Sequence, residues 1–196
     1  MKEDNREIEA KFPVSSIDDY LTKVREAGAV CEQPVHFERN LRFDDNTGKL
    51  SRTAQVLRLR DNGETAVLTY KSDKNSSSGI ADREEIETVV DDLERTRLIL
   101  ERLGFFVDFI YEKFRSIYSL AETGIFLDHT PIGDFIEIEG PDEEAIRNTA
   151  ELLGLDWETR SGKSYRSLFT KWKNETDYPG RDMVFCGGDQ GDRIES

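Results

Sequence analysis

Glu7-Ile8-Glu9-Ala10-Lys11-Phe12, near the start of the 196-residue chain, alternates charged and apolar side chains. Successive side chains of a β-strand point to opposite faces of a sheet, so this stretch predicts a strand with one charged face and one apolar face. The same period of two recurs at residues 56–60, 66–71, 83–87, 111–118 and 135–139, and more weakly at 30–43 and 124–130. The chain is therefore expected to contain about eight strands with two unlike faces.

Other segments space their apolar residues as helices do. Three such segments begin at Ser16, at Asp91 or Asp92, and at Pro141, and each ends at a glycine, residue 28, 104 or 154. Ser and Asp are common helix caps, Pro suits the first turn, and Gly often follows the last residue. A shorter helix is predicted over 165–172. Amphipathic helices of this kind can cover the apolar faces of the strands.

The composition excludes several functions. Lys and Arg number 27 against 41 Asp and Glu, a net charge of −14, which disfavours nucleic acid and anionic membranes as partners. Two His and two Cys far apart in sequence cannot build a His-rich or Cys-rich zinc site. The N-terminus lacks an apolar signal core and no stretch reaches the ~20 apolar residues of a membrane span, so we expect a cytoplasmic protein. Any bound metal should be a hard cation on carboxylates.

The charged strand faces carry the functional information. If the helices pack outside, eight antiparallel strands can close into a barrel, an α+β fold whose lumen is lined by charge. The inward candidates are seven acidic residues, Glu7, Glu9, Glu85, Glu87, Asp128, Glu137 and Glu139, and seven basic ones, Lys11, Arg58, Arg60, Lys71, Arg83, Lys113 and Arg115.

Buried ion pairs rarely repay their desolvation, so a wet lumen that receives a charged ligand explains these residues better. Lys and Arg suit a polyphosphate, and carboxylates suit Mg²⁺ or Mn²⁺. A triphosphate of charge about −4 with two divalent cations is nearly neutral, which matches equal numbers of acids and bases. The alternative is an open sheet whose outer face carries solvated salt bridges, each worth little. Arg42 and Arg52 are interpreted as surface charges.

Six elements of the chain occur in the order typical of one family. Residues 7–11 match an E-x-E-x-K motif, 57–60 an R-x-R strand and 68–71 a lysine strand, and 83–87, 112–115 and 133–139 follow. Lys163-Ser164-Tyr165 is similar to a C-terminal S-Y element. From Arg6 to about Phe169, the sequence resembles the CYTH family of triphosphate tunnel metalloenzymes. That family includes class IV adenylyl cyclases, thiamine triphosphatases and inorganic triphosphatases.

The resemblance implies an eight-stranded antiparallel tunnel that binds a triphosphate and Mg²⁺ or Mn²⁺. It implies metal ligands at Glu7, Glu9, Glu137 and Glu139, with Asp128 as a further candidate. It implies a triphosphate cradle of Lys11, Arg58, Arg60, Lys71, Arg83, Lys113 and Arg115. Glu85 and Glu87 are catalytic candidates, and Lys113, if crowded by Arg115 and Arg58, is a candidate general base.

Three functions remain open from the sequence. The first is a cyclase that converts ATP to cyclic AMP and pyrophosphate, which residues 112–118 and 127–135 resemble slightly more. The second is a tripolyphosphatase or thiamine triphosphatase that hydrolyses the terminal phosphate. The third is a non-catalytic polyphosphate- or nucleotide-binding module. Arg42 stands where the family usually has Tyr, which leaves the recognition of the substrate's non-phosphate end open.

The chain is divided here into one domain, residues 1–173, and an acidic, glycine-containing tail, residues 174–196. The tail holds six acidic residues against two Arg and shows little periodicity. It is expected to be mobile, or else an irregular strap with Tyr178, Met183 and Phe185 resting on the domain. The expected partner is a nucleoside triphosphate or another triphosphate, with a homodimer as a further expectation.

Overall fold

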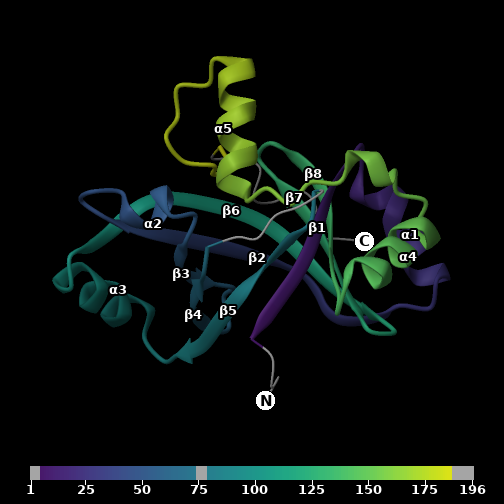
Figure 1. Cartoon of the computed structure of the whole chain (residues 1–196), viewed down its shortest axis with the longest axis horizontal. Coiled ribbons are helices and arrows are strands. Elements are labelled where there is room, and N and C mark those ends of the chain that lie inside the picture. Colours follow the sequence, from purple (N-terminus) through teal and green to yellow (C-terminus); the bar gives the residue numbers. More distant parts are fainter. Residues whose placement is uncertain (1–4, 74–78, 187–196) are drawn as a thin grey trace.

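The strands close into a barrel in the computed structural model, which describes residues 5–73 and 79–186 (Figure 1). All pairings between neighbouring strands are antiparallel, in the order β1-β5-β4-β3-β2-β6-β7-β8 and back to β1. The strands are β1 Arg6–Val14, β2 Val30–Asp45, β3 Val56–Asp61, β4 Ala66–Lys71, β5 Ala81–Val90, β6 Phe105–Leu120, β7 Thr123–Thr130 and β8 Gly133–Glu139. The predicted eight-stranded antiparallel fold is confirmed, and the open-sheet alternative is wrong.

The pairing of β1 with β8 shows how the alternation builds a charged lumen. Lys11 lies opposite Glu137, and the next positions pair Ala10 with Ile138 and Phe12 with Ile136. Because neighbours along a strand point to opposite sides, the charged side chains face inward while the apolar ones face outward. The period of two therefore fixes which side of the barrel is polar.

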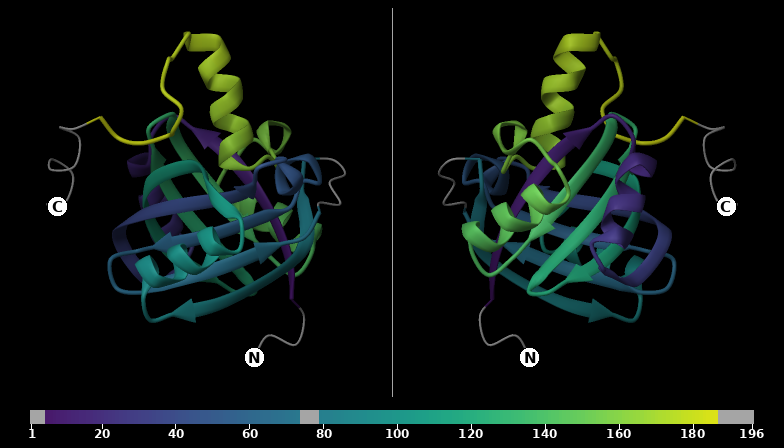
Figure 2. Two further views of the ribbon diagram at one scale, coloured as in Figure 1. Left: turned by 90° about the vertical axis from the view of Figure 1, so that its left-hand side faces the viewer. Right: turned by 90° about the vertical axis from the view of Figure 1, so that its right-hand side faces the viewer.

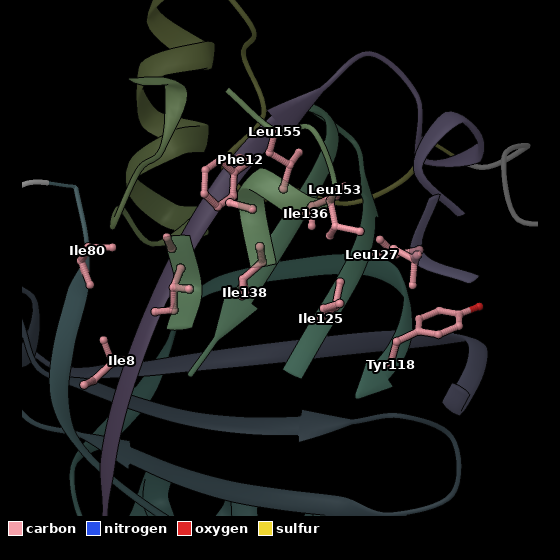
Figure 3. Close-up of a cluster of buried hydrophobic side chains, with 14 residues drawn as sticks. Ile8, Phe12, Ile80, Tyr118, Ile125, Leu127, Ile136, Ile138, Leu153 and Leu155 are labelled. Atoms are coloured by element: carbon pink, nitrogen blue, oxygen red, sulfur yellow. The ribbon is translucent and has the colours of Figure 1, made fainter. Parts of the chain in front are cut away.

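Helices cover the apolar outer surface, as the sequence predicts. Helices α1 (Ile17–Glu26) and α4 (Glu143–Leu152) pack on β7 and β8, and α3 (Leu93–Arg102) packs on β3 and β6 across the barrel (Figure 2). The core under α1 and α4 contains Phe12, Ile136, Ile138, Leu153 and other fully buried side chains (Figure 3). Ser16, Asp92 and Asp142 cap these helices through side-chain oxygens that accept backbone N–H groups.

Helix α5 (Tyr165–Thr176) stands over one mouth of the barrel and is longer than the predicted 165–172 (Figure 1). Two elements were not predicted from the sequence: the four-residue helix α2 (Lys49–Arg52) and the 3₁₀ turn η1 (Trp157–Thr159). Helix α2 is held by the buried carboxylate of Asp44, which accepts the N–H groups of Leu50 and Ser51. Because this carboxylate comes from the preceding strand, the sequence of the helix itself carries no signal of it.

The first part of the predicted tail contacts the barrel. The boundary drawn at residue 173 falls inside α5, and the chain then returns to β6, where Met183 exchanges backbone hydrogen bonds with Ile110 and Glu112. Met183 is 1% exposed and Phe185 is 8% exposed, so both rest on the domain as a strap. Residues 187–196 lie outside the described part of the chain. None of the described helices combines the length and apolarity that crossing a membrane requires.

Candidate active site

A cavity of about 260 Å³ inside the barrel collects the predicted charges. All eight strands and the start of α5 contribute to its lining. Thirteen of the fourteen predicted inward residues line it, and only Asp128 does not. Residues from distant parts of the chain therefore share one pocket, as the strand alternation predicts.

The balance of charge in this cavity differs from the predicted seven against seven. The lining includes eight basic residues, Lys11, Arg42, Arg58, Arg60, Lys71, Arg83, Lys113 and Arg115, and six acidic ones, Glu7, Glu9, Glu85, Glu87, Glu137 and Glu139. Asp128 is buried behind the lining, and Arg42 joins it. The cavity wall is thus net positive although the chain as a whole carries −14.

Three buried carboxylates form a cluster in this wall. Oxygen atoms of Glu7, Glu9 and Glu137 lie within 4.8 Å of one another. The Lys11 ammonium lies between two of them, 2.7 Å from Glu9 Oε1 and 3.2 Å from Glu137 Oε2. Glu139 lines the same cavity but does not belong to this cluster of three. An all-carboxylate donor set fits Mg²⁺ or Mn²⁺.

The neighbours of these carboxylates give them unlike pKa values. Burial, with Glu137 as the next cause, raises the pKa of Glu9 to about 8. Burial also acts on Glu7, but the charges of Lys71 and Arg83 outweigh it and lower its pKa to about 2. Lys11 and Arg115 likewise outweigh burial at Glu137 and hold its pKa well below the usual range. A cation placed in the cluster would therefore displace a proton from Glu9.

Asp128 does not fit the predicted role of metal ligand. It is fully buried, and its two oxygens accept from Arg115 Nε and Nη2, each at 2.6 Å, from Lys113 Nζ at 3.2 Å and from Tyr165 Oη at 2.6 Å. With its lone pairs engaged by these donors, Asp128 orients two cations toward the lumen.

The other cations of the cradle are also held by carboxylates. Lys71 Nζ lies 2.6 Å from Glu7 and 3.0 Å from Glu85. Arg58 Nη2 lies 3.2 Å from Glu87, and it also contacts the hydroxyl of Thr69. These pairs fix long side chains in the lumen before any ligand arrives, which lowers the entropic cost of binding one.

The two glutamates of β5 differ in their chemistry. Burial raises the pKa of Glu85 to about 7, although Lys71 opposes the shift. The pKa of Glu87 is lowered, because Arg58 and its other partners outweigh the effect of burial. A carboxyl group with a pKa near 7 is suited to exchanging a proton at neutral pH.

The surroundings of Lys113 differ from those assumed in the sequence analysis. Its ammonium lies 3.4 Å from Glu38 and 3.2 Å from Asp128, so it forms ion pairs with two carboxylates. Sequence reasoning missed Glu38, which is 1% exposed. It also took Arg42 for a surface charge, which is wrong, because Arg42 lines the cavity. The available signal was the spacing of 38, 40 and 42 on one face of β2, where register shifts weaken the alternation.

Comparisons with known proteins agree with this architecture. A protein of Methanocaldococcus jannaschii named "Putative adenylate cyclase" is 27% identical over 134 residues, 68% of this chain and 75% of that protein. The solved structure of a "putative adenylate cyclase" from Vibrio parahaemolyticus has a TM-score of 0.74 and 22% identity, covering 86% of this chain and 99% of that one. A protein from Hippeastrum, described as a "putative adenylyl cyclase" with a dominant triphosphatase activity, has a TM-score of 0.62 and 21% identity, covering 84% of this chain and 95% of that one.

The two solved structures show a shared fold at low identity, and the family is shown by a separate match. A model of the CYTH domain matches residues 5–166, which include every strand and the whole lining of the cavity. This chain belongs to the CYTH domain family.

Proposed function

We propose that this protein is a divalent-metal-dependent enzyme that cleaves a phosphoanhydride bond of a triphosphate held inside the barrel. The observation that carries the proposal is the cavity itself, where a cluster of three buried carboxylates lies among eight basic side chains. The CYTH family to which the chain belongs is metal-dependent and acts on triphosphates. The carboxylate cluster favours an enzyme over a purely binding module, because a divalent cation held there can activate a nucleophile.

The basic side chains are proposed to hold the phosphates. Arg115 is fixed by Asp128 and keeps its guanidinium beside Glu137, and Lys113 lies next to it on the same carboxylate. Phosphate oxygens can replace carboxylate oxygens at these donors, because Arg and Lys bind both groups by charge-assisted hydrogen bonds. Cations placed in advance also stabilise charge that develops on the transferred phosphoryl group.

Glu7, Glu9 and Glu137 are the residues that would hold the metal, with Glu139 as a neighbour on the same wall. When bound there, a divalent cation supplies charge neutralisation at the phosphates and lowers the pKa of an attacking hydroxyl or water. Glu85 is proposed to take the proton from that nucleophile, since its carboxylate lines the cavity and has a pKa of about 7. Lys113 as general base stays a prediction.

Adenylyl cyclase activity is the first candidate reaction. The name of the relative from M. jannaschii favours this reaction. So does an apolar area of the cavity wall, which is formed by Ile117 and Phe126, register partners on β6 and β7. Such a surface suits a nucleobase. The ribose 3′-hydroxyl would then attack the α-phosphorus and pyrophosphate would leave.

Triphosphate hydrolysis is the second candidate, favoured by the activity described for the Hippeastrum protein. Water would attack the terminal phosphorus, and the same cradle would bind the chain. The substrate in that case is tripolyphosphate or another molecule with a terminal triphosphate.

One assay separates these reactions. The protein is incubated with ATP or tripolyphosphate and with Mg²⁺ or Mn²⁺, and cyclic AMP, pyrophosphate and orthophosphate are followed. Cyclic AMP with pyrophosphate supports the cyclase, orthophosphate alone supports the hydrolase, and binding without turnover contradicts an enzymatic role. Glu9→Gln should abolish either activity, whereas Glu64→Gln, on an exposed turn, should not; full activity of Glu9→Gln would refute the metal assignment.

A further inference from the structure

Arg42 differs from the other cations of the cavity. Seven of the eight basic lining residues have a carboxylate oxygen within 4.0 Å, whereas Arg42 forms no ion pair with any residue that the structure describes. Its Nε atom is buried and finds no hydrogen-bond partner there. Its register partner across the β2–β3 ladder is another cation, Arg58. Arg42 as a whole is half-buried, and an unpartnered buried Nε is shared by Arg58 and Arg60, so what sets Arg42 apart is the missing ion pair. A half-buried guanidinium without a carboxylate partner is stabilised when an anion joins it.

Arg42 also lines a second cavity, of about 390 Å³, which we call the Arg42 cavity. The two cavities share Arg42, Val56, Arg83 and Ser164, so they meet at the mouth of the barrel below α5. The remaining polar lining includes Arg166 and the hydroxyl groups of Ser167 and Thr170. No carboxylate from the described ranges, 5–73 and 79–186, lines it.

The other two arginines of this cavity already have partners. Arg83 pairs with Glu7 at 3.2 Å, and Arg166 pairs with Asp108. Burial and the neighbouring cations Arg166, Arg83 and Arg58 lower the pKa of Arg42 to about 10, against the opposing effect of Tyr111. The side chain thus stays charged at neutral pH, in a place where positive charge is unbalanced.

These observations favour an anionic occupant over a neutral one. A nucleoside at this mouth would leave the charge of Arg42 uncompensated, whereas a phosphate can bind its guanidinium through two parallel hydrogen bonds. Thr170 Oγ1 donates to the Arg166 carbonyl, but the Ser164 and Ser167 hydroxyl groups hydrogen-bond each other at 3.2 Å, which leaves one hydroxyl proton of this pair for a phosphate oxygen. A phosphate chain lying in the barrel would meet this cavity at Arg42, Arg83 and Ser164, which line both cavities.

We propose that the Arg42 cavity binds a further phosphate of a linear phosphate chain, beyond the three that lie in the barrel. Arg42 is then a specificity-determining residue that favours a tetraphosphate over a triphosphate. The inference rests on the proposed function, because the triphosphate in the barrel is what places the next phosphate beside Arg42. The extra phosphate can belong to an inorganic chain or to a nucleoside tetraphosphate.

The test is isothermal titration calorimetry on the full chain without divalent cations, so that no metal-dependent turnover interferes. The ligands are tripolyphosphate, tetrapolyphosphate, ATP and adenosine 5′-tetraphosphate. The wild type should bind tetrapolyphosphate at least tenfold more tightly than tripolyphosphate. Arg42→Ala should reduce this preference to threefold or less, and Arg42→Lys should keep part of it. Arg52→Ala is the matched control, since it removes an exposed arginine that lines neither cavity.

Each outcome bears on the inference. A similar gain for adenosine 5′-tetraphosphate over ATP supports it and admits a nucleotide source, whereas a gain for tetrapolyphosphate alone supports an inorganic chain. Equal affinities of the wild type for three and four phosphates would overturn it, as would a preference unchanged in Arg42→Ala. In those cases, binding of tripolyphosphate leaves the proposed function standing. If the wild type binds neither phosphate chain, the inference is overturned, and the metal-dependent activity assay still decides the proposed function separately.

Discussion

At the scale of single residues, neighbouring groups in the lumen give glutamates very different pKa values. Glu7 and Glu9 lie two positions apart on β1, and both are buried. The pKa of Glu7 is about 2 because Lys71 and Arg83 outweigh its burial, whereas the pKa of Glu9 is about 8 because it is buried beside Glu137. At neutral pH one is an anion and the other holds a proton. The motif alone predicts two carboxylates but not this difference.

The raised pKa of Glu9 predicts pH-dependent metal binding. Below pH 8 a divalent cation must displace the proton, so the affinity for Mn²⁺ should rise by up to about tenfold per pH unit from pH 6 to 8 and level off above pH 8. The stability of the metal-free fold has the opposite pH dependence and falls as the pH rises. The shift stabilises the fold fully below the unfolded-state value of about 4.5, and this stabilisation is lost as pH rises through 8.

Calorimetric titration with Mn²⁺ in two buffers of different ionisation enthalpy measures both the affinity and the protons released. Glu9→Gln should bind weakly with little pH dependence, and Glu64→Gln should behave as the wild type. An affinity that stays constant from pH 6 to 9 in the wild type would contradict the assignment.

Glu85 should govern the pH dependence of turnover. With a pKa of about 7 it becomes a proton acceptor above neutral pH, so kcat should rise through this range. Glu85→Gln should lower kcat by about 100-fold and flatten that limb of the profile. Glu84→Gln changes the exposed neighbour on the opposite face and serves as the control. The role is refuted if both variants keep the wild-type profile.

Arg42 is expected to lower the free energy of unfolding of the unliganded protein. Replacing a half-buried charge that has no ion-pair partner with an apolar side chain of similar length removes that cost, so Arg42→Met should raise the Tm by about 2–4 °C. Arg115→Met should do the opposite, because it leaves Asp128 buried without its main partner. Differential scanning calorimetry without ligands compares the Tm of both variants with that of the wild type. A lower Tm for Arg42→Met would contradict the account of this residue.

At the scale of elements, prediction succeeded where the signal is local. Strand β1 and helices α1, α3 and α4 were predicted because alternation, caps and terminal glycines all lie within each segment. Strand β2 was less distinct, because register shifts near Gln33 and Arg42 interrupt its alternation. The cavity-lining Arg42 and the buried Glu38, which pairs with Lys113, therefore went unrecognised. Helix α2 depends on a carboxylate from the preceding strand, which no pattern within the helix reveals.

The strap after α5 should contribute measurable stability. Met183 and Phe185 are buried against the domain, and Phe185 N–H donates to Glu112 Oε2. Ending the chain at Thr176 removes both side chains, each worth roughly 1.5–3 kcal/mol of burial. The Tm should then fall by at least about 5 °C.

A chain ended at Gly187 is the matched control, because it retains the strap. Thermal unfolding followed by circular dichroism compares the two truncations with the full chain. Equal Tm values for all three would show that the strap is only loosely attached.

At the scale of the whole molecule, the sequence predicted the closed barrel through the count of two-faced strands and through resemblance to the CYTH family. Alternation alone could not exclude an open sheet, since a solvated outer face would show the same period. The predicted set of inward residues was nearly correct, since thirteen of the fourteen line the cavity. Asp128 was misassigned as a metal ligand because inward direction does not reveal which donors occupy its oxygens. Arg42 was taken for a surface charge because register shifts in β2 obscure its inward direction. The Arg42 cavity is lined by residues of β2, α2, β3, β5 and α5, so no pattern within a single segment predicts it.

The most direct test of the central claim is a crystal structure with Mn²⁺ and a non-hydrolysable ATP analogue, with the metal located by its anomalous signal. The account predicts Mn²⁺ on the carboxylates of Glu7, Glu9 and Glu137 and phosphates among Arg58, Lys113 and Arg115 inside the barrel. An analogue bound on the outer surface, or metal coordinated without any of the three glutamates, would contradict it.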